Sequence, residues 1–204
     1  GAKLGVAGDV YASGFFNTSG VTGGYKIDNQ LLAYASSTNT ATIFGLAAGG
    51  QGATTSSSLN PSAFGYQALN SNAAVNNTAF GYQALKLTTT GINNTAIGHQ
   101  ALTDNVAGLS GVAVGTFASR NNLGASETVA IGSFAADGNS DYTAVGYTVV
   151  GYRAGKTLST GADYNTLLGY QSGSQVTTGY GNILLGSSQT ANNLSTGSSN
   201  IGIG

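Results

Sequence analysis

A short apolar pattern recurs along most of the chain, and each copy closes on a glycine. The segments "NPSAFGYQAL" (60–69), "NNTAFGYQAL" (76–85) and "NNTAIGHQAL" (93–102) differ at only a few positions. Repetition at so short a period indicates that the repeat is itself the architecture, as in solenoid proteins. The closing glycines, called anchors below, recur about every 17 residues. The anchors are Gly45, Gly65, Gly81, Gly98, Gly115, Gly132, Gly151, Gly169, Gly186 and Gly204.

The three residues before each anchor predict a β-strand. A large apolar residue such as Phe80 or Ile97 directly precedes the anchor, and a mostly β-branched residue such as Thr95 lies three positions before it. Alternation of such residues with small ones at period two is a strand signal. Clusters of Gly, Asn and Thr interrupt every apolar run, which excludes long helices. The small residue between them is most often alanine: Ala63, Ala79, Ala96, Ala113 and Ala130.

A period near 17 residues has room for two short strands and two turns. One such unit cannot bury its own apolar residues, whereas stacked units form a continuous core. We therefore predict an all-β fold, a parallel β-solenoid of about ten coils over residues 45–204, preceded by an N-terminal β-region at 1–44 that caps it or joins it to a stalk. Gly146 fits the anchor motif locally, but Gly151 keeps the period. Residues 137–147 are therefore interpreted as an insertion or bulge.

The two faces of the predicted strand are expected to have different roles. We expect the large apolar column, which includes Ile97, to face the inside of the coil, and we expect an Ile97→Asp change to break the rod. The alanine column then offers a flat outer strip on which another chain packs closely. A further column of asparagines, four positions before the anchors, is expected to form turns and a hydrogen-bonded ladder. Its members are Asn77, Asn94, Asn165, Asn182 and Asn200.

The motifs "NTAIG" and "NTAFG" resemble the head repeats of trimeric autotransporter adhesins. This resemblance implies a left-handed parallel β-roll, a homotrimer and an extracellular location. The segment "AKLGVAGDVYASG" (2–14) separately resembles segments of phage tail fibres and bacterial surface proteins that end in a self-cleaving chaperone domain. These resemblances suggest a fragment of a longer fibre, with either kind of parent open.

The composition argues against several classes of function. Only 6% of residues are charged and the net charge is −1, so the chain lacks the basic patch of a nucleic-acid binder. Without cysteine there is neither a disulfide framework nor a thiolate zinc site. No run approaches the ~18 apolar residues of a membrane helix, so we expect no direct membrane insertion. The stretch "GYRAGKT" (151–157) is one residue short of a phosphate-binding loop, and the repeat already accounts for it; no cofactor is expected.

One column of side chains is a candidate binding surface. Aromatic and amide residues follow equivalent anchors and should stack one coil apart. Facing outward, they would bind a glycan or a flat polymer. Facing inward, they would be core or inter-chain packing, which we favour because aromatic residues usually bury area. The candidate residues are Tyr66, Gln67, Tyr82, Gln83, His99 and Gln100.

A second candidate is a cation site. Asp137, Asn139 and Asp141 alternate as ligands do in calcium loops. The sixth position is Tyr142 instead of glycine and no glutamate occupies the twelfth, so a polar turn is the alternative interpretation.

Catalytic residues are not expected. The single histidine, His99, lies inside the repeat, and the acids are scattered between anchors where solvated turns should be. We therefore expect a non-enzymatic, adhesive segment of an extracellular trimeric fibre, a rigid spacer whose partners are its own copies and a host-surface glycan or protein. The alternative is the shaft or receptor-binding region of a phage tail fibre, and a fibre-borne polysaccharide hydrolase is disfavoured.

Overall fold

The computed structural model describes residues 25–27, 30–35, 41–49, 60–71, 74–188 and 194–204. These residues form twelve strands in a single sheet, and the described part contains no α-helix. The strands are β1 (Tyr25–Ile27), β2 (Gln30–Ala35), β3 (Thr42–Phe44), β4 (Ser62–Phe64), β5 (Thr78–Phe80), β6 (Thr95–Ile97), β7 (Val112–Val114), β8 (Val129–Ile131), β9 (Thr148–Val150), β10 (Thr166–Leu168), β11 (Ile183–Leu185) and β12 (Ile201–Ile203).

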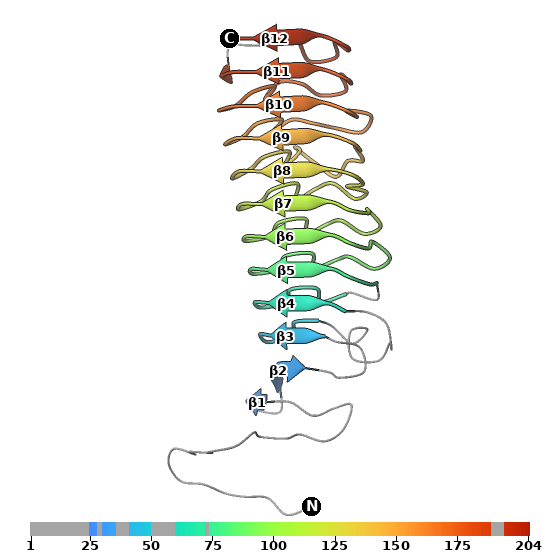
Figure 1. The fold of residues 1–204 in the computed structure, drawn as a ribbon, viewed down its shortest axis with the longest axis vertical. Coiled ribbons are helices and arrows are strands. Elements are labelled where there is room, and N and C mark those ends of the chain that lie inside the picture. The colour runs from blue at the N-terminus through green and yellow to red at the C-terminus, as the bar shows by residue number, and fades with distance from the viewer. Residues whose placement is uncertain (1–24, 28–29, 36–40, 50–59, 72–73, 189–193) are drawn as a thin grey trace, which may run out of the picture.

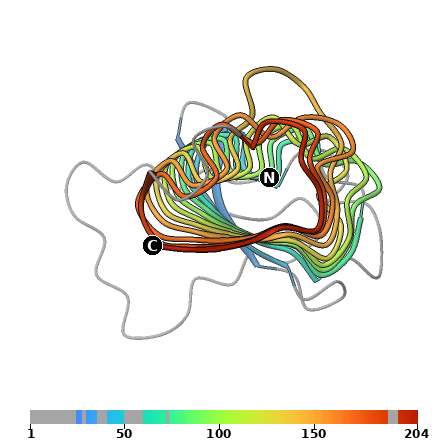
Figure 2. The ribbon, with the colours of Figure 1, turned by 90° about the horizontal axis from the view of Figure 1, so that it is seen from above.

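The strands pair strictly in chain order. β1, β2 and β3 are antiparallel, and from β3 to β12 every neighbouring pair is parallel. The register places equivalent repeat positions side by side, so that Ala96 of β6 lies beside Ala113 of β7. Figure 1 shows the strands as rungs up one side, and Figure 2 shows the coils superimposed around one closed outline. The predicted all-β parallel solenoid is therefore confirmed, whereas residues 2–14 lie outside the described part.

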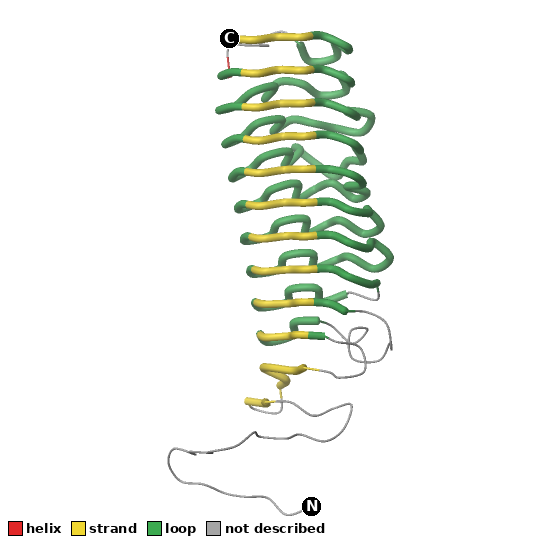
Figure 3. Tube along the Cα trace, in the orientation of Figure 1, coloured by secondary structure: helices red, strands yellow, loops and turns green. Residues whose placement is uncertain are grey.

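Each complete coil carries one strand, and the rest of the coil is turn and loop (Figure 3). The prediction of two strands per unit is therefore wrong. The reason lies after the anchor, in the "YQAL" segment. Gln83 has φ +55° and Leu85 has φ +50°, and the same two positions are left-handed in neighbouring coils. Two left-handed residues within one short segment are incompatible with extended strand geometry.

The anchor glycines stack in a column, as predicted. Gly98 has φ +135°, and a Cβ placed on it would lie 2.5 Å from the carbonyl oxygen of Gly115 in the next coil. Gly65 has the same relationship to Gly81, with 2.5 Å between the hypothetical Cβ and the carbonyl oxygen. Neither the backbone conformation nor the coil spacing admits a side chain, so both select glycine.

The two strand faces are oriented opposite to our expectation. The alanine column is completely buried inside the coils, as at Ala79 and Ala96. The large column faces outward: Phe80 is 57% exposed and Ile97 is 42% exposed. Ile97 is therefore not a core residue, and the expected breakage by Ile97→Asp loses its basis.

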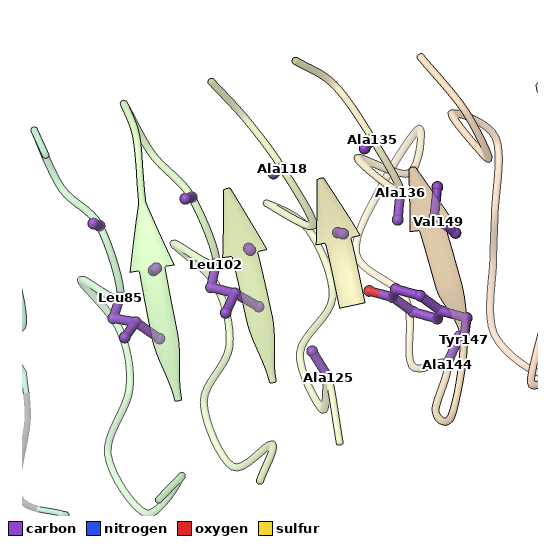
Figure 4. Close-up of a cluster of buried hydrophobic side chains, with 14 of the residues drawn as sticks. Leu85, Leu102, Ala118, Ala125, Ala135, Ala136, Ala144, Tyr147 and Val149 are labelled. Carbon is purple, nitrogen blue, oxygen red and sulfur yellow. The ribbon is translucent and has the colours of Figure 1, made fainter. Parts of the chain in front are cut away.

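The interior needs alanine on the strand because the opposite wall supplies the bulk. In the coils that carry Ala79 and Ala96, Leu85 and Leu102 are fully buried four residues after the anchor. Figure 4 shows these two leucines at equivalent places on successive coils. A coil this thin has no room for two large side chains on facing walls at close-packed density.

Later coils exchange the sizes of the two walls. In the coil of β10, Leu167 takes the strand position and Gly173 takes the opposite one, and both are buried. In the coils between these two arrangements, both walls carry small residues: Ser119 lies opposite Ala113, and Ala136 lies opposite Ala130. Side chains of the insertion at 137–147 fill the remaining space. Buried tyrosines Tyr142 and Tyr147 do this; Figure 4 shows Tyr147 beside the small core residues.

The insertion keeps the register that the period predicts. Gly151 has φ +137° and stacks on Gly169, so it is the true anchor, whereas Gly146 has φ +64° and faces the ring of Tyr164. In Figure 2 a gold loop extends beyond the common outline at this place. The Tyr147 hydroxyl lies 2.5 Å from Ser119 Oγ, so its polar end is satisfied within the core.

The predicted asparagine ladder is present. The Asn77 Oδ1 accepts a hydrogen bond from the backbone N–H of Asn94 at 2.9 Å, and the Asn165 Oδ1 accepts one from Asn182 at 3.0 Å. These amides are fully buried. Each one satisfies backbone groups of the next coil that no strand pairing reaches, which ties successive coils together.

Candidate functional site: the aromatic ladder

Seven rings follow one another along the rod and form what we call the aromatic ladder. Neighbouring ring centroids lie 5.0–6.4 Å apart. The ladder consists of Tyr66, Tyr82, His99, Phe117, Phe134, Tyr152 and Tyr170. The stacking one coil apart that the sequence predicted is thus confirmed for its first three members.

The first three rings are stacked nearly parallel. Tyr66 and Tyr82 are inclined by 18° and Tyr82 and His99 by 8°. Tyr66 is 46% exposed and Tyr82 is 43% exposed, so the expectation that this column is core of the single chain is wrong. Because each ring covers the face of the next, the stack presents ring edges and hydroxyl groups to solvent. Its outward chemistry is hydrogen bonding more than face-on stacking.

A glutamine ladder runs beside these rings. Gln83 Nε2 donates to Gln67 Oε1 at 2.8 Å, and Gln100 Nε2 donates to Gln83 Oε1 at 2.7 Å. Gln83 therefore donates to one neighbour and accepts from the other, and these bonds fix the orientation of the three amides. The structure thus brings all six predicted binding residues together on one strip.

Sequence reasoning missed the middle of the ladder. Phe117 and Phe134 follow their anchors by two residues, whereas the tyrosines follow by one. In those coils Thr116 and Ser133 take the tyrosine position, and the ring enters from the neighbouring column. A signal was present in the sequence: in both coils the aromatic residue is absent from the tyrosine position and present at the next position instead.

Two arginines lie over this middle section. The Arg120 guanidinium carbon is 4.5 Å from the Phe117 centroid, and Arg153 is 5.6 Å from Phe134 and 5.2 Å from Tyr152. Cations over aromatic faces are attracted by the ring quadrupole. The ladder therefore changes character along the rod, from tyrosine and glutamine at one end to rings with arginine towards the other.

The predicted cation residues are separated by burial. Asp137 is 3% exposed, and its Oδ1 lies 3.1 Å from Arg120 Nε, whereas Asn139 and Asp141 are exposed. The expectation that the acids are all solvated is wrong for Asp137. Burial raises its pKa, and the attraction of Arg120 offsets part of that rise. The sequence also suggested a cation at these three residues, and that suggestion remains a prediction.

The surroundings of the single histidine bear on whether the ladder has chemical activity. His99 is exposed, stacks on Tyr82 and meets Phe117 edge-on at 5.0 Å. In the part of the chain that the structure describes, no three His, Cys, Asp or Glu residues are grouped as metal ligands would be. Among the same residues no helix is long and apolar enough to span a bilayer. Among the described residues, the ladder is a row of rings and amides with two arginines beside it.

Comparisons with family models, with curated proteins and with solved structures yield no match to this chain. The likeness to adhesin head repeats therefore rests on the repeat motif, and what the structure adds to it is the parallel β-solenoid with about nine turns and stacked anchor glycines.

Proposed function

We propose that the chain is a structural segment of an extracellular homotrimeric fibre, a rigid spacer without catalytic activity that also holds a surface ligand. The observation that carries the proposal is the apolar outer face of the parallel sheet. We call the outward residues of β3–β12 the outer sheet face. They lie one and three positions before each anchor.

The outer sheet face is suited to contact another chain. Strands β3–β12 contain no charged residue, and their outward positions hold Phe, Ile, Leu and Val together with Thr and Ser. Phe44, Phe80 and Ile97 are each more than two-fifths exposed, and Phe64 stacks on Phe80 at 5.5 Å. A contiguous exposed apolar strip of this length is typical of an interface. The sequence led us to expect that another chain packs on the alanine column. Because those alanines are buried, we assign this contact to the outer sheet face instead.

Rigidity supports the spacer role. Anchor stacking, the asparagine ladder and the glutamine ladder each link neighbouring coils. A solenoid of this kind is stabilised by the interfaces between neighbouring coils, so these links stiffen the rod along its length. Three copies follow from the resemblance to adhesin heads; a phage tail-fibre shaft is the second candidate, motivated by residues 2–14.

Sedimentation velocity of the 204-residue chain tests the assembly. We expect a trimer at micromolar concentration, and we expect Ile97→Arg to dissociate it while keeping the far-ultraviolet spectrum of the rod. Leu109→Arg is the matched control, because Leu109 is 43% exposed but lies between β6 and β7, outside the outer sheet face. A monomeric wild type, or equal behaviour of both variants, would refute the proposed interface.

A further inference from the structure

We propose that the C-terminal end of the aromatic ladder is a binding site for an acidic saccharide, in which Arg153 holds the carboxylate and Tyr170 stacks on the sugar ring. This deepens the proposed function by naming a ligand class and a place, and it rests on the ligand-holding part of that function alone. The site consists of Tyr152, Arg153, Tyr170 and Gln171.

The first observation is a difference between two similar arginines. Arg120 and Arg153 both lie over ladder phenylalanines, but Arg120 is paired with Asp137. That pair is the one ion pair among the described residues. Arg153 has no carboxylate within ion-pairing distance in the same part of the chain. A half-buried guanidinium in this state favours an anion as its missing partner.

The second observation concerns geometry. The Arg153 guanidinium carbon lies 5.6 Å from the Phe134 centroid and 5.2 Å from the Tyr152 centroid, so two rings hold this group in place. A guanidinium whose face is stacked keeps its edge free to donate two parallel hydrogen bonds, the geometry that matches a carboxylate. The aromatic support reduces the side-chain freedom that binding would otherwise remove.

The third observation identifies the neutral part of the ligand. Tyr170 is 58% exposed and is the last ring of the ladder, stacked on Tyr152 at 5.5 Å. In the next coil Ser187 takes the equivalent position, and a serine is too small to cover the ring. Among the described residues no further ring stacks on Tyr170, so its outer face offers a platform for the C–H face of a sugar. Gln171 Nε2 lies 3.5 Å from the Tyr170 hydroxyl and adds amide groups for sugar hydroxyls.

The charge pattern favours an acidic sugar over a polyanion. The chain has six Lys and Arg residues and a net charge of −1. A nucleic acid would need a row of basic residues along its backbone. One stacked arginine beside an uncovered tyrosine and an amide instead matches one carboxylate on an otherwise neutral, hydroxyl-rich ring.

Isothermal titration calorimetry with trigalacturonic acid and 3′-sialyllactose tests the site, with galactotriose as the neutral probe. We expect at least one acidic probe to bind roughly tenfold more tightly than galactotriose, and Arg153→Gln to remove about that factor. Lys86→Gln is the matched control, since it removes one positive charge from a coil far along the rod and should leave binding unchanged. Tyr170→Ser should weaken binding of both acidic and neutral probes without touching the stack below Tyr152.

Several outcomes would overturn the site. These are absence of binding by both acidic probes, equal affinity for galactotriose, equal losses in Arg153→Gln and Lys86→Gln, or full competition by acetate at the same concentration. If Arg153→Gln fails to fold, the preference of the wild type for the acidic probes over galactotriose still tests the carboxylate site, and Tyr170→Ser tests the sugar platform. Binding that persists in Ile97→Arg would support this site even if the trimer proposal failed, so the two proposals fail separately.

Discussion

The side chain of Leu167 occupies the space that a side chain at Gly173 would need: a Cβ placed on Gly173 would lie 2.7 Å from Leu167 Cδ2. Gly155 in the preceding coil has the same neighbour, with 3.0 Å from the hypothetical Cβ to Leu167 Cδ1. The core is thus filled from one wall here and from the other wall at Leu102. Constant core volume, more than constant residue identity, is what the coils share.

This complementarity predicts a rescue. Leu167→Ala should destabilise the rod by about 2–5 kcal/mol because it leaves a cavity. Gly173→Leu should also destabilise it, because the new side chain meets Leu167. Together the two changes reproduce the arrangement of Ala96 and Leu102, so the double variant should be more stable than the sum of the single losses predicts. Chemical denaturation of the four proteins measures this coupling, and additive losses would show that the walls are independent.

A second prediction separates backbone strain from coil contact. Gly98→Ala should cost several kcal/mol, because its Cβ would be forced against the carbonyl of Gly115. Gly161→Ala is the control: Gly161 also has positive φ, +88°, but nothing lies within 4 Å of its hypothetical Cβ. We expect about 1–2 kcal/mol there from strain alone. Similar losses of unfolding free energy in both variants would contradict a role for anchor stacking.

The sequence was sufficient to predict the architecture, but not which face of each strand lies inside the coil. Strict recurrence of the anchors determined the parallel stacking and the register, including the choice of Gly151 over Gly146. Alternation along the strand shows that its two faces differ, but it does not say which face is inside. Placing large residues inside failed because the facing wall is built by Leu85 and Leu102, which lie beyond the strand. The repeated leucine of "YQAL" is the signal that indicates an interior of alanine.

The aromatic site was predictable only in part for a related reason. Tyrosines at one fixed position were visible as a column, whereas Phe117 and Phe134 come from the next position. Which rings carry a charged neighbour depends on side-chain reach between coils. Arg120 and Asp137 both lie five residues after their anchors, one coil apart, whereas Arg153 lies two residues after its anchor and is followed in its column by Gln171. The repeat spacing therefore held this distinction, but the anchor motif alone did not point to it.

A third prediction concerns acid stability. Burial raises the pKa of Asp137, and burial also raises the pKa of Asp104. The folded rod therefore binds these protons more tightly than the unfolded chain, whose carboxyls have the ordinary value of 3.8. The resulting stability is fully present below pH 3.8 and is lost as pH rises through the raised folded values.

Thermal melts over this range check the sign. The wild type should melt at a higher temperature near pH 4 than near pH 7. Asp137→Asn should flatten this dependence, whereas Glu127→Gln, a change at an exposed acid, should leave it intact. A melting temperature that falls from pH 7 to pH 4 would contradict the assignment.

The face of the strand that lies inside determines both the core and the proposed interface, and thiol labelling of two adjacent positions tests this directly. The chain has no cysteine, so Ala96→Cys and Ile97→Cys each report one site without background. We predict that Ala96→Cys resists labelling at every protein concentration. Ile97→Cys should be labelled rapidly in dilute solution and more slowly as the chains assemble. Labelling of Ala96→Cys as fast as Ile97→Cys, with both variants folded, would contradict the buried alanine column and the outer sheet face together.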